Sequence, residues 1–301
     1  MVEENRAFLE EETLALGIPV DGKERLLRVG ELSAGELRRR ILHIGSNQKA
    51  AAEDTPARPP QFCPGCGHRG IFHLLAKHKI IVNGDIGCYG LAALPPYDAM
   101  DTLICMGASI GMNHGMSKTL GEGERAVAVI GDSTFFHSGM TGLANLVHNG
   151  GNATTIVLDN RITAMTGHQP SPTTGRRATG QDTAVLAIPD LCRALGVQHI
   201  REVDAYDMDA MEQVVLDEIA RPEPSVIVVN QRCSIIERKK TGQMYIVNDD
   251  CKKCGKCFQL GCPALTKGEA HTIILEDFCD GCGLCAKVCP FGAIVEKETN
   301  E

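Results

Sequence analysis

Short apolar runs alternate, between residues 80 and 230, with segments whose apolar side chains recur at helical spacing. The runs are four to six residues long and rich in valine and isoleucine, which is typical of strands buried on both faces of a sheet. We expect strands at Ile80–Asn83, Thr102–Met106, Ala126–Ile130, Thr154–Leu158, Gln198–Val203 and Ser225–Asn230. The helical spacing predicts a helix ending near Lys77, one following Ser133, and others at Ser109–Leu120, Ile188–Leu195 and Met208–Ala220. This alternation indicates an α/β fold with a doubly wound, mostly parallel sheet.

The segments outside this alternation suggest two further parts. Amphipathic stretches at Arg6–Leu16 and Ala34–Ile44 predict a helical arm over residues 1–55. The proline-broken tract Asp54–Gln61 marks the start of the α/β domain, which we place at residues 56–244. From Asp249 the composition shifts to Cys, Gly, Lys and Asp, and this shift predicts a small α+β domain at residues 245–301.

Composition and charge narrow the class of protein. The formal net charge of −8 argues against a nucleic-acid partner, and no apolar run is long enough to span a bilayer. The amino terminus is acidic and lacks the basic-then-apolar pattern of a secretion signal. We therefore expect a cytoplasmic protein, in which eight of the fourteen cysteines, those in two compact arrays, serve metal ligation rather than disulfides.

Eight of these cysteines form two arrays in the tail, each closed by Cys-Pro. The second array has the spacing of bacterial two-cluster ferredoxins, in which the fourth cysteine of each run binds the other [4Fe–4S] cluster. We assign one cluster to Cys251, Cys254, Cys257 and Cys289, and the second to Cys279, Cys282, Cys285 and Cys262. One extra residue precedes Cys262 compared with the usual spacing. A zinc ribbon is the alternative, but its paired CxxC knuckles fit these three-cysteine runs poorly.

Two strand ends carry residues that suit a magnesium diphosphate. The run Ala126–Ile130 stops at Gly131-Asp132-Ser133, and the next strand ends at Asp159-Asn160. In a parallel sheet these turns share the carboxyl edge, where ligands bind. Asp132, Asn160 and the carbonyl near Ile162 could supply oxygens to Mg²⁺, and the amides of Ser133–Phe135 could face the phosphates. A plain strand-to-helix loop is the alternative reading of this motif.

Four more cysteines are expected near the same edge. They are Cys63, Cys66, Cys88 and Cys233, which precede a helix or follow a strand. Together they could hold a third [4Fe–4S] cluster, or they could be four separate thiols. Cys105 and Cys192 lie in apolar segments and are expected in the core. His68, His137 and His168 could line the site or be ordinary loop histidines.

The motifs ARPPQFCPGCGHRG, NGDIGCYGL, ICMGASIG, VIGDSTFFHSGM and LDNRITAMTGHQP together resemble the alpha subunits of indolepyruvate:ferredoxin oxidoreductases, within the 2-oxoacid:ferredoxin oxidoreductase family. The resemblance extends from about Glu31 to the end of the chain. It implies that thiamine diphosphate and Mg²⁺ are held by Gly131, Asp132, Ser133, Thr134, Asn160, Ile162 and Thr163. It also implies that Gly87, Cys88 and Tyr89 approach the thiamine rings, and that the third cysteine set binds a cluster close to the cofactor.

The reaction that the resemblance implies joins an aryl 2-oxoacid, coenzyme A and oxidised ferredoxin to give aryl-acetyl-CoA, CO₂ and reduced ferredoxin. The implied partners are external ferredoxin, a beta- or gamma-type subunit, and a subunit bearing the pyrimidine-binding domain. That domain carries the activating glutamate in the family, so the chain's catalytic acid or base is not assigned. Three alternatives remain: another 2-oxoacid as substrate, an electron-transfer module with a vestigial thiamine domain, or a non-redox decarboxylase with a zinc tail.

Overall fold

The computed structural model describes residues 1–45, 59–121, 124–237 and 244–297, and the chain divides into two units, Met1–Pro59 and Pro60–Glu301. The first unit contains the two expected helices, α1 (Phe8–Ala15) and α2 (Ala34–Ile41). Ser33 begins α2 by accepting a hydrogen bond from the Glu36 amide, as an N-cap residue does. Most of the expected linker, Asp54–Gln61, lies outside the described residues.

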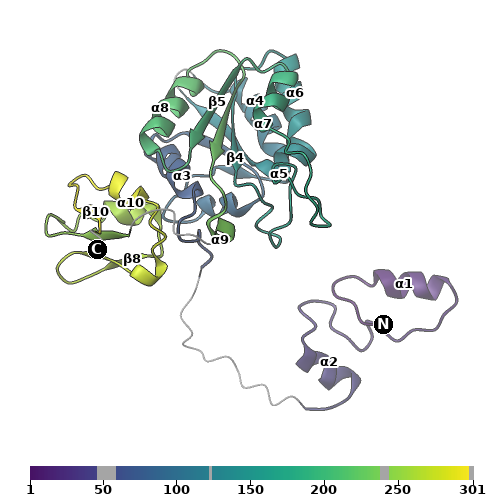
Figure 1. Ribbon diagram of the computed structural model, residues 1–301. Helices are drawn as coiled ribbons and strands as arrows, with labels where there is room; N and C mark the ends of the chain where they lie inside the picture. Colours follow the sequence, from purple (N-terminus) through teal and green to yellow (C-terminus); the bar gives the residue numbers. More distant parts are fainter. Residues whose placement is uncertain (46–58, 122–123, 238–243, 298–301) are drawn as a thin grey trace. The chain divides into compact units, whose positions relative to one another are not determined.

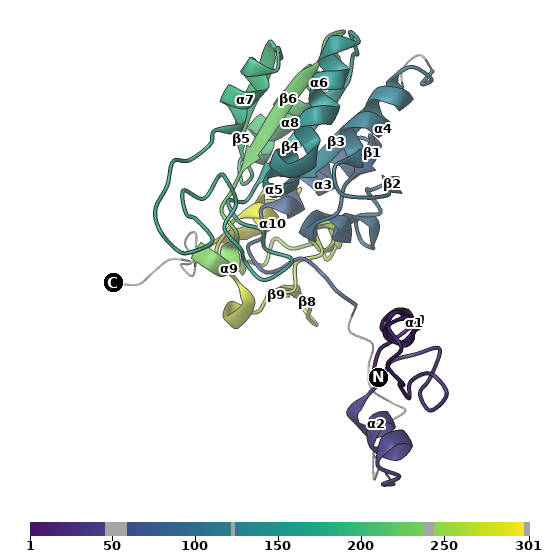
Figure 2. The same cartoon turned by 90° about the vertical axis from the view of Figure 1, so that its right-hand side faces the viewer.

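The second unit is built on a six-stranded, all-parallel sheet with the strand order β2-β1-β3-β4-β6-β5. The strand labels follow one another across Figure 2 in this order, from β2 on the right to β5 on the left. The order reverses direction between β1 and β3, which lie side by side while β2 follows β1 on its other side, so the sheet is doubly wound as predicted. Its strands are β1 (Ile81–Gly84), β2 (Thr102–Leu103), β3 (Ala126–Gly131), β4 (Thr154–Asp159), β5 (His199–Asp204) and β6 (Ser225–Asn230).

Helices cover both faces of this sheet (Figure 1). One face packs against α3 (His68–Lys77) and α8 (Met208–Ile219), and the other against α4 (Ala108–Ser117), α6 (Met140–His148) and α7 (Ile188–Ala194). Alternation along β3 accounts for the two layers: Val127 and Val129 are buried with α3 and α8, whereas Ala128 and Ile130 are buried with α4 and α6. Shorter helical segments are η1 (Cys88–Ala93), α5 (Asp132–Thr134), the π-helical turn η2 (Phe135–Gly139) and α9 (Ser234–Glu237).

The strand expected at Thr102–Met106 is shorter than predicted. β2 ends at Leu103 because the buried carboxylate of Asp85 accepts hydrogen bonds from the amides of Gly107 and Ser109, and these bonds start α4 there. Cys105 is therefore exposed, and the prediction that it is a core residue was wrong. Cys192 is fully buried, as expected.

The tail contains two small antiparallel sheets, which pair β7 with β10 and β8 with β9. Both views place the tail on the side of the sheet where α5 and α9 lie, which is the carboxyl edge (Figures 1 and 2). Leu284 packs into the same buried cluster as α3 and α8, so the tail shares a core with the parallel-sheet domain. The tail elements are β7 (Tyr245–Val247), η3 (Lys256–Leu260), β8 (Leu265–Lys267), β9 (Thr272–Ile274), η4 (Glu276–Phe278), α10 (Leu284–Lys287) and β10 (Ile294–Glu296).

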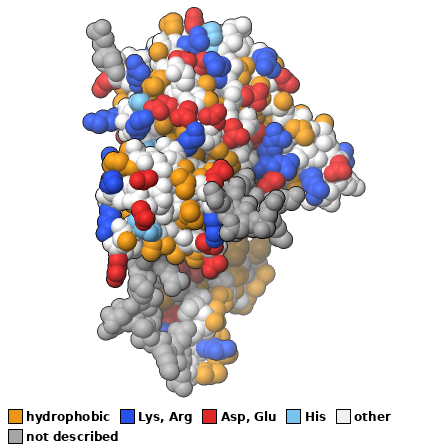
Figure 3. Space-filling model, turned by 60° about the vertical axis from the view of Figure 1, so that its left-hand side comes forward, with side chains coloured by type: hydrophobic (Ala, Val, Ile, Leu, Met, Phe, Trp, Pro, Cys, Tyr) orange, Lys and Arg blue, Asp and Glu red, His pale blue; other side chains and the backbone are white. Residues whose placement is uncertain are grey.

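Among the helices of the described residues, none combines the length and apolar character needed to cross a bilayer. On the face drawn in Figure 3, acidic and basic side chains are interspersed with apolar ones. The net negative charge is therefore not gathered into one field on that face.

We predict that Leu146→Ala lowers the free energy of unfolding by about 2–5 kcal/mol, because Leu146 is fully buried between α6 and the sheet. The matched control is Leu186→Ala, whose side chain is 47% exposed and whose loss should cost less than about 0.5 kcal/mol. Urea unfolding followed by circular dichroism compares the two variants. Equal losses would contradict the assignment of α6 to the core.

Candidate cofactor site

The turns after β3 and β4 lie side by side at the carboxyl edge of the sheet. β3 and β4 are paired in parallel, with Gly131 opposite Leu158, so the chain leaves both strands at the same level. Beyond the strands, the hydroxyl of Thr163 donates a hydrogen bond to Ser133 Oγ at 2.9 Å. The structure therefore joins the two segments that the sequence placed together.

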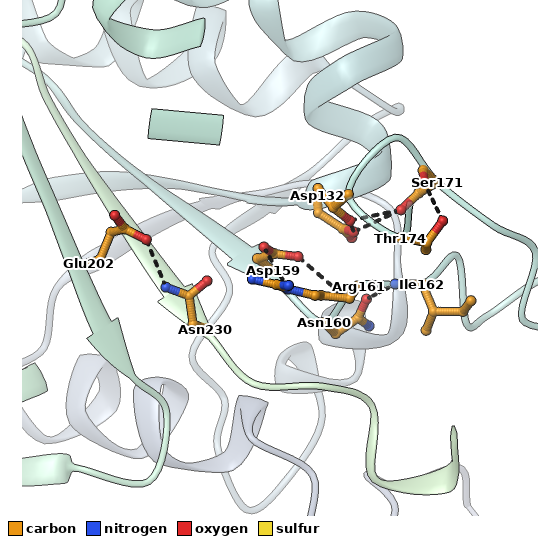
Figure 4. A network of polar contacts seen from close by, with 10 residues as sticks. Asp132, Asp159, Asn160, Arg161, Ile162, Ser171, Thr174, Glu202 and Asn230 are labelled. Carbon is orange, nitrogen blue, oxygen red and sulfur yellow. Dashed lines mark hydrogen bonds and ion pairs between the residues drawn. The ribbon is translucent and has the colours of Figure 1, made fainter. Parts of the chain in front are cut away.

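Asp132 is buried and is held by a loop that sequence reasoning missed. Its Oδ2 accepts a hydrogen bond from Ser171 at 3.1 Å (Figure 4). The same oxygen accepts a second hydrogen bond from Thr173 at 2.7 Å. Burial, together with the nearby carboxylate of Asp159, raises the pKa of Asp132 to about 6. The two hydroxyl donors offset only part of the free-energy cost of burying the Asp132 carboxylate. A cation bound at this turn would therefore be stabilised.

Asn160 and Arg161 shape the second turn. The Asn160 side-chain oxygen accepts from the Ile162 amide at 3.1 Å, and the Arg161 amide donates to Asp159 at 3.1 Å. Arg161 has a positive φ of 55°, a conformation in which the chain turns sharply. Asp132 and Asn160 thus have different partners (Figure 4): the Asp132 carboxylate accepts from Ser171, whereas the Asn160 side-chain oxygen accepts from the Ile162 amide within its own turn.

Ser171 and Thr173 belong to the long connection that runs from residue 160 to residue 187, between β4 and α7. Connections of this length without regular structure are uncommon inside compact domains and frequently carry function. The length and its run of hydroxyl residues were the available signal. Which carboxylate the hydroxyls bind depends on how the loop folds back over the edge.

Tyr89 supports the Gly131 turn from below. Its hydroxyl accepts from the Gly131 amide at 2.9 Å and donates to the Ile86 carbonyl at 3.1 Å, and its side chain is 4% exposed. Glycine is required at two contact points, because a Cβ would lie 2.4 Å from the Tyr89 ring at Gly87 and 2.9 Å at Gly131. The segment Gly87–Tyr89 therefore lies next to the Gly131 turn, and Tyr89 holds that turn in place.

One cavity of about 230 Å³ is lined by all four cysteines expected near this edge, namely Cys63, Cys66, Cys88 and Cys233. The cavity is also lined by Asn160, and by His68 and His168. Burial raises the pKa of Cys66 to about 12 and lowers that of His68 to about 4. His137, by contrast, is exposed and shares a hydrogen bond with neighbouring Ser138.

The eight tail cysteines surround two further cavities, in the grouping that the spacing suggested. One is lined by Cys262, Cys279, Cys282 and Cys285, and the other by Cys251, Cys254, Cys257 and Cys289. Every cysteine of the chain is a free thiol. Burial raises the pKa of Cys282 to about 11 and raises that of Cys285 further.

Two family models match the chain. The C-terminal thiamine-pyrophosphate-binding domain of thiamine pyrophosphate enzymes matches residues 85–229, and the 4Fe–4S binding domain matches residues 272–295. The class is therefore a thiamine-pyrophosphate-binding α/β domain fused to an iron–sulfur ferredoxin domain.

Within this class, the chain belongs to the same family as the indolepyruvate oxidoreductase subunits IorA. It is 35% identical to the IorA of Thermococcus kodakarensis and 36% identical to that of Pyrococcus horikoshii, with 100% of this chain and 53% of each relative covered. The chain spans about half the length of these relatives. A solved structure of 2-oxoglutarate:ferredoxin oxidoreductase from Magnetococcus marinus is 18% identical, with a TM-score of 0.49, over 61% of this chain and 70% of that one. A likeness at that level carries no argument about substrate.

We predict that Tyr89→Phe destabilises the Gly131 turn, because it leaves the buried Gly131 amide without an acceptor, at a cost of about 1–3 kcal/mol. Hydrogen exchange by mass spectrometry should show faster exchange in the peptide containing Gly131–Thr134. The control is Tyr245→Phe, whose hydroxyl bonds Glu296 in an exposed position. Unchanged exchange at Gly131 in Tyr89→Phe would contradict the supporting role.

Proposed function

We propose that this chain is the part of a thiamine-diphosphate-dependent 2-oxoacid:ferredoxin oxidoreductase that anchors the cofactor's diphosphate and conducts electrons away from it. The substrate is an aryl pyruvate, with indolepyruvate as the first choice, coenzyme A is the acyl acceptor and ferredoxin receives the electrons. The observation that carries this proposal is the series of three four-cysteine cavities that begins at the cofactor turns and continues through the tail.

The three cavities are lined by segments that adjoin one another, which favours electron transfer between them. We call them the first, second and third cavity in order from the cofactor turns into the tail: Cys88 lines the first, Cys282 the second and Cys254 the third. Asn160 lines the first cavity, which places that cavity beside the β4 turn. The segment containing Cys63 and Cys66 continues into Arg69, which lines the second cavity, and Cys285 of the second cavity packs in one buried cluster with Cys257 and Cys289 of the third.

The sulfur sets fit iron–sulfur clusters. A [4Fe–4S] cluster binds each thiolate to a different iron atom, so the four sulfurs surround a space rather than converge on a point. Within the part of the chain that the structure describes, no three His, Cys, Asp or Glu side chains are grouped to hold a single metal ion, as a zinc site requires. Coordination would also keep the high-pKa thiols of Cys66 and Cys282 deprotonated in their buried positions.

The turn around Asp132 fits a magnesium diphosphate. We assign Mg²⁺ to Asp132, Asn160 and the Ile162 carbonyl, and the phosphates to Gly131, Ser133, Thr134 and Thr163. Ser171 and Thr173 would keep the Asp132 carboxylate oriented. Thiamine diphosphate supplies carbanion stabilisation when bound, and the contribution of this chain is to hold and orient it.

The rest of the active site belongs to a partner in this proposal. Because the chain corresponds to about half of the IorA relatives, the group that activates the pyrimidine ring lies on the other half or on a separate subunit. The chain alone should therefore hold its clusters without converting a 2-oxoacid. The relatives' name supports indolepyruvate as substrate, and another 2-oxoacid would be compatible with the same turns.

We predict that Cys88→Ser removes about one third of the iron and acid-labile sulfide from anaerobically purified chain, because only the centre in the first cavity is lost. Chemical iron and sulfide analysis measures this. The matched control is Cys105→Ser, which changes an exposed cysteine outside all three cavities and should retain full content.

Two outcomes would contradict the proposed function. If the wild-type chain contained zinc and no acid-labile sulfide, its cysteines would hold a structural metal and not electron-transfer clusters. Clusters in all three cavities, but no binding of thiamine diphosphate and Mg²⁺ even with the partner half present, would reduce the chain to an electron-transfer module.

A further inference from the structure

Arg69 is a buried positive charge between two of the cysteine cavities. It is the second residue of α3, three positions after Cys66, and only 1% of it is exposed. Its guanidinium donates to the carbonyls of Gly261 at 2.6 Å, Leu260 at 2.8 Å and Cys63 at 2.9 Å, and also to the Phe62 carbonyl.

These acceptors come from two different parts of the chain. Phe62 and Cys63 belong to the segment that provides the first cavity, whereas Leu260 and Gly261 directly precede Cys262 of the second cavity. Tyr97 adds to the same junction, because its hydroxyl donates to the Leu260 carbonyl. One side chain therefore fixes how the two cysteine-bearing segments approach each other.

The charge of Arg69 has no carboxylate partner within ion-pair distance among the residues that the structure describes, and its acceptors are neutral oxygens. A buried ion held only by dipoles is costly, so a nearby negative charge would stabilise it. A [4Fe–4S] centre bound by four thiolates is such a charge.

We propose, on the basis of the function proposed above, that Arg69 is a positioning residue whose buried charge raises the reduction potential of the centre bound by Cys262, Cys279, Cys282 and Cys285. Reduction adds one electron to that centre and transfers no proton, so its negative charge grows beside a fixed cation. Arg69 lines the second cavity and not the first, so its effect is larger on the second centre. Electrons are thereby drawn from the first centre toward the tail.

Arg232 offers a matched comparison. It lines the first cavity, its side chain is 63% exposed, and it lies 3.8 Å from Glu237. Solvent and this partner screen its charge, so it should have little influence on the second centre.

The test uses the full chain, purified without oxygen, with iron and sulfide counted before each titration with dithionite. Electron paramagnetic resonance follows reduction, and the signal lost in Cys282→Ser identifies the second centre. Arg69→Met and Arg69→Gln should make its midpoint potential more negative, where each tenfold loss in the equilibrium constant for reduction corresponds to 59 mV. Arg69→Lys should retain most of the wild-type potential, and Arg232→Met should not change it.

The outcomes separate charge from structure. Equal potentials in wild type, Arg69→Met and Arg69→Gln would overturn the proposal, as would a shift in Arg69→Lys as large as in the neutral variants. Loss of the second centre from the neutral variants, with retention in Arg69→Lys, would support it, whereas loss from all three would show a purely structural role. Absence of iron and sulfide from the wild-type chain would instead refute the proposed function.

Discussion

Parallel pairing of β3 with β4 is the constraint on which the candidate site depends. Because Gly131 lies opposite Leu158, β3 and β4 end at the same edge of the sheet and point in the same direction. Asp132 and Asn160 therefore begin neighbouring loops. Parallel strands need a crossover that covers the sheet faces, and here helices pack on both faces, so polar residues of the site lie in the loops at the carboxyl edge. The same edge receives the cysteine-bearing segments before α3 and after β6.

The tail depends on that edge as well as on its own metal chemistry. Its own buried cluster contains only Cys257, Leu265 and Ile294, which is a small core for a folded unit. Leu284 packs into the core of the parallel-sheet domain, and Lys287 forms an ion pair with Asp209 of α8. The tail is therefore attached to the domain from which it is proposed to receive electrons, and this attachment keeps the second cavity close to the first.

Polar groups at the edge are satisfied by short-range bonds that also set the shape of the site. Asp85 uses its carboxylate to start α4, and Tyr89 uses its hydroxyl to hold Gly131. Asp132 is different, since it is buried beside Asp159 with hydroxyl donors and has a raised pKa. Buried carboxylates are usually stabilised by more donors or by a cation, so a bound cation would stabilise this one.

The sequence by itself determined the alternation of strands and helices, the parallel sheet and the grouping of the tail cysteines, because hydrophobic periodicity and metal-ligand spacing are local signals. It was wrong about Cys105, since the end of β2 is set by Asp85, which accepts a hydrogen bond from the Gly107 amide 22 positions further along the chain. Tertiary structure alone decided that Ser171 and Thr173 reach Asp132 and that Arg69 joins two cysteine-bearing segments. Those contacts join residues dozens to nearly two hundred positions apart, and no local pattern in the chain encodes which distant acceptor a buried donor will meet.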